Sequence, residues 1–212
     1  MRAGARTIAP LLPAVVAFGV SYGVLARASG MGALAPVVMS ATTFAGSAQF
    51  AAASILGDAG TVAAAVVAAV LLNARYAPMS VAVGRGFHGP LWRRFLVSQL
   101  IVDESWALSA RGEGRFDVPF LLGAGLTLYP VWVSGTAIGV AAGDLVGDPE
   151  RLGLDAAFPA LFLALLAGQI QTGPARMAAL LGGAIAAVLV PIAPAGIPIV
   201  AAVAACLIGA RR

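Results

Sequence analysis

The stretch Thr42-Thr43-Phe44-Ala45-Gly46-Ser47-Ala48-Gln49-Phe50 lies inside an apolar run, residues 33–56, that otherwise consists mainly of alanine, valine, methionine, isoleucine and leucine. On the helical period of 3.6 residues, its small and hydrogen-bonding side chains gather on one side. In hydrocarbon each hydroxyl or amide on that side needs a hydrogen-bond partner. A membrane segment that keeps such a face either holds helices together or lines a path for a polar molecule.

The composition around this stretch indicates a membrane protein. The chain has 212 residues, of which 60% are hydrophobic and 10% charged, and its mean hydropathy is +0.96. In globular domains roughly a quarter of the residues are charged. Several apolar runs here reach the ~20 residues that are needed to cross a bilayer. We therefore expect an all-α polytopic membrane protein, a single domain over 1–212 with about seven to eight membrane segments, in the bacterial cytoplasmic membrane.

The charge, the cysteine content and the absence of common catalytic motifs argue against several classes of function. The net charge of +4 is carried by 13 arginines without lysine, which favours cytoplasmic loops near anionic lipid over nucleic-acid binding. The single cysteine, Cys206, excludes a disulfide framework within the chain and is expected to be a small buried side chain. No P-loop and no H-E-x-x-H motif occurs. We expect no metal, no cofactor and no enzymatic activity.

Glycine patterns predict close helix packing. Arg2 and Arg6 precede an apolar run from Ile8 to Ala26, which is expected to remain in the protein rather than to be removed as a signal peptide. Residues 19–23, Gly-Val-Ser-Tyr-Gly, match the G-x-S-x-G pattern of serine hydrolases. That pattern needs a strand-turn-helix context and a histidine partner, whereas the same residues form G-x-x-x-G, a packing face. Glycines 135, 139, 143 and 147 make a second such face.

A second polar interruption falls within the run from Thr61 to Val83. Here Asn73, Arg75 and Tyr76 precede Pro78, whose ring removes a helical hydrogen bond near Ala74. An arginine in hydrocarbon costs ~2.5–3.5 kcal/mol on insertion scales. Either Arg75 extends from a helix end to the interface or this broken segment lines a functional path.

Acidic residues supply a third group of candidates. Asp103 and Glu104 end the apolar segment that begins at Phe95, and either anchor it at the interface or form a proton or ion site. Asp155 opens a later apolar segment, as a helix N-cap or as a functional acid, and Pro159 marks a helix break there. The only histidine, His88, is expected in a surface loop.

A weak repetition suggests two inverted repeats, 8–84 and 118–190, each with a broken helix, as is common in transporters. Strict alternation of the apolar runs would place Arg85, Arg93 and Arg94 outside, against the positive-inside tendency. If residues 33–57 instead form a re-entrant segment, this basic loop moves to the cytoplasmic side.

Four motifs resemble the AzlC family, the large subunits of bacterial branched-chain amino acid exporters. They are Phe-Ala-Gly-Ser-Ala-Gln-Phe at 44–50, Leu-Leu-Asn-Ala-Arg-Tyr at 71–76, Asp-Glu-Ser-Trp-Ala-Leu at 103–108 and Leu-Asp-Ala-Ala-Phe-Pro-Ala-Leu-Phe at 154–162. The resemblance implies export of leucine, isoleucine, valine or related amino acids. It also implies a partner, a small AzlD-type membrane protein.

An amino acid needs sites for its carboxylate, its ammonium group and its side chain. Backbone N–H groups at Gly46 and Ser47 suit the carboxylate if the helix breaks there, and Arg75 is the alternative. Gln49, Asn73 or an acid would accept from the ammonium. The expected path residues are Thr43, Phe44, Gly46, Ser47, Gln49, Phe50, Asn73, Arg75 and Tyr76, with Asp103, Glu104 and Asp155 as candidates for proton coupling.

Two other functions stay open at this stage. A membrane enzyme is disfavoured because the serine motif has no partner. The chain could instead be an assembly subunit, with the path formed by another protein, or a transporter of another small zwitterion.

Overall fold

The computed structural model describes residues 1–57, 59–84, 86–111, 115–146, 163, 166–167, 170, 172–193, 197–203 and 205. Regular structure in these residues is helical, apart from an isolated bridge between Ala110 and Phe116, so the predicted all-α class is confirmed. Three described spans are long and apolar enough to cross a membrane: Arg2–Ala28, Val62–Gly84 and Val118–Gly143. The expected seven to eight segments are not confirmed.

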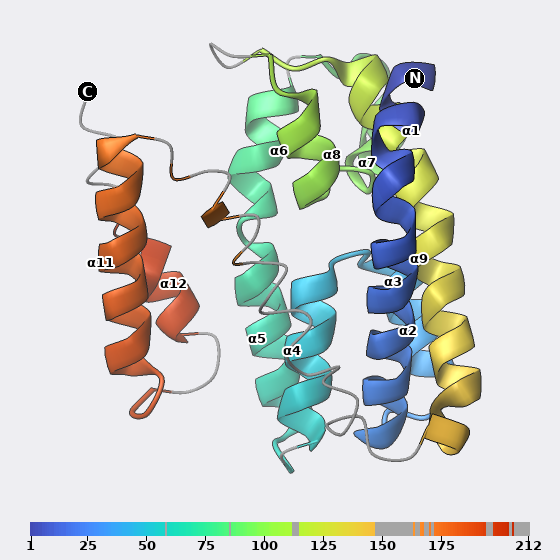
Figure 1. Ribbon diagram of the computed structural model, residues 1–212, viewed down its shortest axis with the longest axis vertical. Helices are drawn as coiled ribbons and strands as arrows, with labels where there is room; N and C mark the ends of the chain where they lie inside the picture. The colour runs from blue at the N-terminus through green and yellow to red at the C-terminus, as the bar shows by residue number, and fades with distance from the viewer. Residues whose placement is uncertain are drawn as a thin grey trace.

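Two of these spans pack side by side and run in the same direction (Figure 1). The first consists of α1 (Arg2–Ile8), a 3-10 turn (Ala9–Leu11) and α2 (Leu12–Ala28). The other is α9 (Val118–Val146), which contains Pro130. Gly4 lies against the backbone of Phe120 near the start of both spans, and Arg27 lies against Gly143 near the end of both. The two spans are therefore parallel.

Glycine makes this close approach possible. A Cβ placed on Gly19 would lie 3.2 Å from the Cα of Gly135, and one on Gly23 would lie 2.6 Å from the backbone nitrogen of Val140. Ser21, within the G-x-S-x-G pattern, donates its hydroxyl to the carbonyl of Ala17 at 2.7 Å in the helix interior. The packing interpretation is confirmed for Gly19 and Gly23 and for Gly135, Gly139 and Gly143, while Gly147 lies outside the described residues.

The stretch around Phe44 breaks into two short helices. These are α3 (Leu34–Thr42) and α4 (Gly46–Gly57), and Phe44 between them has φ +43°, which non-glycine residues seldom adopt. A Cβ on Gly57 would lie 3.5 Å from the Cβ of Ser29, at the end of α2. The chain thus enters at one end of the bundle, turns at its middle and returns to the same end (Figure 1).

The next span is interrupted near its centre. Thr61 caps α5 (Val62–Asn73) by accepting from the N–H of Ala64 at 3.1 Å, and α6 (Tyr76–Gly84) continues towards the other end of the bundle. Ala74 and Arg75 form a turn between them. The break lies four residues before Pro78, whose missing N–H would otherwise bond the carbonyl of Ala74.

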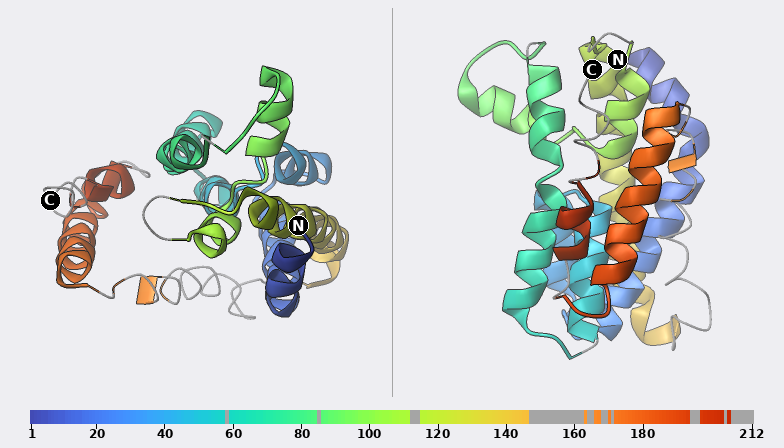
Figure 2. Two further views of the ribbon diagram at one scale, coloured as in Figure 1. Left: turned by 90° about the horizontal axis from the view of Figure 1, so that it is seen from above. Right: turned by 90° about the vertical axis from the view of Figure 1, so that its left-hand side faces the viewer.

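Two further short helices follow at the end where the chain starts (Figures 1 and 2). They are α7 (Leu91–Ser98), whose residues from Leu91 to Leu96 are all exposed, and α8 (Asp103–Ser109). Asp117 then caps α9. The N–H of Phe120 donates to its carboxylate at 2.9 Å, and this bond, with Arg111 nearby, lowers the pKa of Asp117.

The last described helices, α11 (Gly173–Leu189) and α12 (Ile197–Val203), lie to one side of the others, and α12 contacts α5 (Figure 2). The inverted repeats 8–84 and 118–190 are not confirmed. The helices that begin them run parallel, whereas inverted repeats would place them antiparallel. Asp155, Pro159 and Cys206 lie outside the described residues.

The distribution of arginines between the two ends of the bundle indicates how the protein is oriented in the membrane. Because residues 34–57 return to their own end, the loop that holds His88 lies at the end where the chain starts, with Arg2, Arg6, Arg111 and Arg115 and with α7 (Figure 1). Positive residues favour the cytoplasmic side. This end is therefore expected to face the cytoplasm, as the re-entrant interpretation required.

Thiol labelling checks this orientation. In a Cys206→Ser background, His88→Cys should react with a membrane-impermeant maleimide only after the cells are permeabilised, and Ala33→Cys should react in intact cells. Both native residues are exposed, at opposite ends of the bundle. The opposite labelling pattern would contradict the orientation.

Candidate functional site

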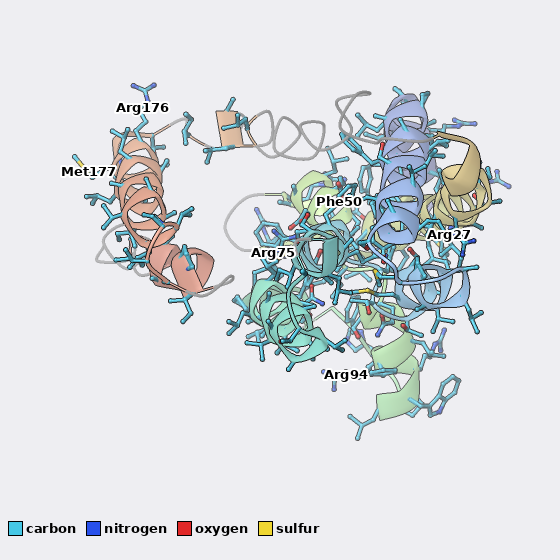
Figure 3. All side chains as sticks on the ribbon, turned by 90° about the horizontal axis from the view of Figure 1, so that it is seen from below. Arg27, Phe50, Arg75, Arg94, Arg176 and Met177 are labelled. Atoms are coloured by element: carbon cyan, nitrogen blue, oxygen red, sulfur yellow. The ribbon has the colours of Figure 1, made fainter. Side chains whose placement is uncertain are left out.

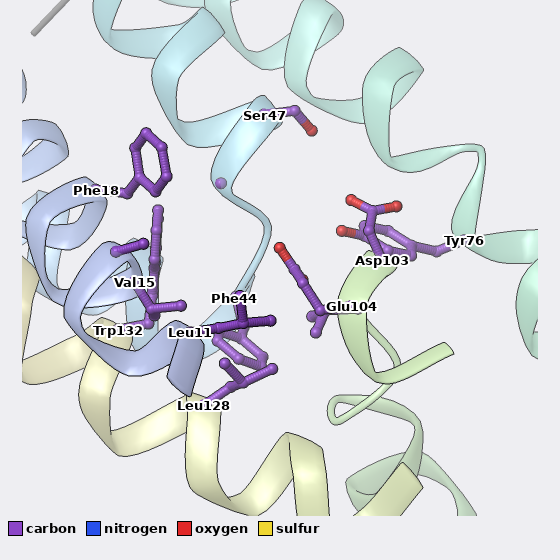
Figure 4. Close-up of a pocket in the computed structure, with 13 residues that line it drawn as sticks. Leu11, Val15, Phe18, Phe44, Ser47, Tyr76, Asp103, Glu104, Leu128 and Trp132 are labelled. Atoms are coloured by element: carbon purple, nitrogen blue, oxygen red, sulfur yellow. The ribbon is translucent and has the colours of Figure 1, made fainter. Parts of the chain in front are cut away.

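A cavity of about 130 Å³ lies where the interrupted helices meet. Its two sides differ in chemistry (Figure 4). One side carries Ser47 of α4, Tyr76 of α6, and Asp103 and Glu104 at the start of α8. The apolar side comes mainly from the first span and α9, with Phe44 between α3 and α4; it includes Leu11, Val15, Phe18, Phe44, Leu128 and Trp132.

Arg75 connects the interrupted elements beside this cavity. Its Nη2 donates to Ser47 Oγ at 2.6 Å and to Asp103 Oδ2 at 2.8 Å, and its guanidinium lies over the ring of Tyr76, 5.2 Å from the centroid. Arg75 is in the middle of the Val62–Gly84 span, inside the bundle (Figure 3). Arg75 therefore does not extend from the end of the span to the membrane interface.

Gln49 has a different position from the one expected. Its side chain is fully buried and does not line the cavity. Gln49 Oε1 accepts from the N–H of Ala45 at 3.2 Å and from Trp132 Nε1 at 2.9 Å, while Nε2 donates to Ser40 Oγ at 2.6 Å. These bonds hold the break between α3 and α4 against α9.

The network continues through two hydroxyls. Ser40 and Thr136 are 2.8 Å apart, and Thr136 donates to the carbonyl of Trp132 at 3.0 Å. Because Gln49 already donates to Ser40, the serine hydroxyl in turn donates to Thr136. Each hydroxyl thus accepts one hydrogen bond and donates the next, from Gln49 through Ser40 and Thr136 to the carbonyl of Trp132. Buried polar groups in apolar surroundings need such complete pairing.

The other predicted residues divide between the cavity and its surroundings. Six line it: Phe44, Gly46, Ser47, Tyr76, Asp103 and Glu104. Phe50 is buried against Tyr22, with ring centroids 5.7 Å apart, and Thr43 is the capping residue that follows α3. Asn73 ends α5, and its buried Oδ1 accepts no hydrogen bond within the described part of the chain. The site assignment as a whole stays a prediction.

Sequence reasoning predicted Phe44 on the apolar side of the site, but it missed the other named residues of that side and the partners of Gln49. No sequence pattern distinguishes these residues from the long apolar runs that contain them: Leu11, Val15, Trp132 and Thr136. The glycine patterns of residues 19–23 and 135–147 did predict tight packing. They did not say that these two helices are each other's partners, which is what brings Trp132 to Gln49.

Comparisons with known proteins give one family. A family model described as AzlC protein matches residues 10–146. An archaeal protein of Archaeoglobus fulgidus, named "Uncharacterized membrane protein", is 32% identical over 84% of this chain and 78% of its own length. The "Branched-chain amino acid transport protein AzlC" of Bacillus subtilis is 27% identical over 82% of this chain and 69% of its own.

A membrane protein of Haemophilus influenzae is 30% identical over 84% of this chain and 75% of its own length. No solved structure matches the chain. Together with the three apolar spans, these relatives make the chain a multi-pass membrane protein.

Proposed function

Because the chain belongs to the AzlC family, we propose that it is a membrane permease subunit that exports branched-chain or related amino acids through the cavity between α2, α4, α8 and α9. The observation that supports this most strongly is the two-sided cavity. Charged and hydroxyl groups of Ser47, Asp103 and Glu104 face aliphatic and aromatic side chains across it. An amino acid with an apolar side chain has the same division.

The size and walls of the cavity suit a branched side chain. Its volume of about 130 Å³ is close to that of the roughly 150 Å³ cavity that accepts benzene in an engineered protein. Leu11, Val15 and Leu128 would pack against the aliphatic carbons. Burial of a valine or leucine side chain contributes about 1.5–3 kcal/mol, which favours these substrates over small polar amino acids.

The start of α4 suits a carboxylate. Gly46 and Ser47 are the first residues of this 12-residue helix and line the cavity. The first N–H groups of a helix have no partner within it and carry the positive end of the dipole. Half-helices that end at a central site are typical of secondary transporters.

We assign proton coupling to Glu104 rather than Asp103. Asp103 is paired with Arg75, whereas Glu104 lines the cavity without a salt bridge among the described residues. The charged or titratable groups near it are Asp103, Arg75 and Tyr76. A carboxyl group without a cation partner can take up and release a proton without breaking an ion pair.

Replacing Glu104 with glutamine tests this assignment. In proteoliposomes, E104Q should lose leucine accumulation driven by a pH gradient and keep leucine–leucine exchange, because exchange needs no net proton movement. D117N, on the exposed side chain before α9, is the control and should keep both. Full pH-driven accumulation by E104Q would exclude Glu104 as the carrier of the proton.

The partner in this proposal is a small AzlD-type membrane protein. The chain leaves large apolar side chains exposed on α7, among them Leu91 at 80% and Trp92 at 65%. Lipid or another membrane subunit has to cover such a surface. The family resemblance favours a subunit as part of the cover.

An efflux assay tests the function itself. Cells that express the chain with an AzlD-type subunit, loaded with a leucine-containing dipeptide, should release leucine several-fold faster than cells with the subunit alone. A chain that only supports assembly would give no gain in leucine or in any other amino acid released. That result would contradict the permease proposal.

A further inference from the structure

The ion pair between Arg75 and Asp103 joins three interrupted elements at one point. Arg75 is in the break between α5 and α6, Asp103 is the first residue of α8, and Ser47 is the second residue of α4. A single nitrogen of Arg75 bonds both of the other side chains. While these bonds hold, α4, the break between α5 and α6, and α8 are tied together on the polar side of the cavity.

We propose that the substrate displaces this ion pair by exchange. The substrate carboxylate replaces Asp103 on Arg75, next to the start of α4, where Ser47 also bonds Arg75. The substrate ammonium replaces Arg75 on Asp103. The inference rests on the proposed function and adds the two residues that bind the charged groups of the amino acid.

Both partners are accessible enough for this exchange. The side chains of Arg75 and Asp103 are 29% and 28% exposed, and Asp103 lines the cavity. Arg75 does not itself line the cavity, but it is hydrogen-bonded to two residues that do, Ser47 and Asp103, so a ligand that displaces Asp103 meets its guanidinium. The pair also lies on the polar side, opposite the apolar wall that would hold the side chain of an amino acid (Figure 4).

The remaining contacts would hold each charge in place after the pair opens. Arg75 keeps the hydroxyl of Ser47 and the ring of Tyr76, so its guanidinium stays at the cavity when Asp103 leaves it. Asp103 is fixed at the start of α8, where the helix dipole favours a negative charge. The site therefore does not have to rebuild itself around the ligand.

Charge balance gives the selectivity. Removing one partner from a partly buried ion pair leaves the other charge uncompensated, which is costly. A zwitterion restores both charges, since it supplies one partner to each. An amine restores only Asp103, and a carboxylic acid restores only Arg75. The site should thus prefer an amino acid to either of its singly charged analogues.

Reciprocal variants give the test, with binding measured calorimetrically on the purified chain with its partner subunit. The probes are leucine, 3-methylbutylamine, which lacks the carboxylate, and 4-methylpentanoate, which lacks the amino group. Wild-type protein should bind leucine at least tenfold more tightly than either analogue. R75Q should gain at least tenfold in affinity for the amine, and D103N at least tenfold for the acid, because each leaves one charge free to pair.

The double variant R75Q/D103N removes both charges of the pair and keeps the test decisive if a single variant does not fold. It should bind leucine at least tenfold more weakly than wild type and without preference over the analogues. R176Q, at an exposed position near the start of α11, should bind like wild type. Wild-type preference retained in the double variant, or in both single variants, would overturn ion-pair exchange. If wild-type protein neither binds nor exports leucine, the proposed function itself fails.

Discussion

Replacing Gln49 with leucine is expected to lower the thermal midpoint of the purified protein on the order of 6–12 °C. The substitution leaves the Trp132 indole N–H, the Ala45 N–H and the Ser40 hydroxyl without their bonds to this side chain. Each unpaired buried group costs about 1–3 kcal/mol, so a loss of roughly 3 kcal/mol or more follows. Thermal unfolding in detergent measures it.

Gln99→Leu is the matched control, because it makes the same chemical change in a half-buried glutamine that lies outside the hydrogen-bond network around Gln49. Its midpoint should stay within about 2 °C of wild type, since substitutions away from such networks usually change stability by at most ~0.5 kcal/mol. Equal midpoints for the two variants would show that the Gln49 network does not hold the break between α3 and α4.

Replacing Arg75 with alanine is expected to lower leucine efflux roughly tenfold to a hundredfold. The change leaves Asp103 without its cation and removes the bond to Ser47. Loss of one partner of a buried pair costs about 3–5 kcal/mol. The partial exposure of this pair reduces that cost to about 1–3 kcal/mol, and 1.4 kcal/mol corresponds to a factor of ten. The dipeptide-loaded efflux assay measures the result.

Arg176→Ala removes an arginine from an exposed position near the start of α11 (Figure 3) and serves as the control. It should leave efflux within about twofold of wild type, because exposed charges contribute little. Membrane levels of both variants have to be equal for the comparison. Wild-type efflux by the Arg75 variant at equal membrane level would remove Arg75 from the site.

Local chemistry explains which features could be predicted from the sequence. Pro78 cannot donate a backbone hydrogen bond, so a break near Ala74 was predictable from one residue. Hydroxyl and amide groups in an apolar run need partners, and the stretch from Thr42 to Phe50 does form the turn between α3 and α4. Repeated glycines predicted a close helix contact, which α2 and α9 make.

Features that depend on distant residues were not predictable in this way. Gln49 was assigned to the substrate because an amide in hydrocarbon needs a polar partner. The structure supplies that partner from Trp132, 83 positions along the chain. Similarly, Asp103 could be an anchor or a site residue on sequence grounds. Its pairing with Arg75 depends on the return of residues 34–57 to their own end of the bundle, which changes the position of every later element.

Substrate protection of Ser47 tests most directly whether amino acids pass through this cavity. Ser47→Cys in a Cys206→Ser background places a thiol on the polar wall, and its rate of reaction with a small methanethiosulfonate is measured with and without leucine. Leucine should slow the reaction several-fold at Ser47→Cys and leave the exposed Ala33→Cys unchanged. An unchanged rate at Ser47→Cys, in a protein that still exports leucine, would place the path elsewhere.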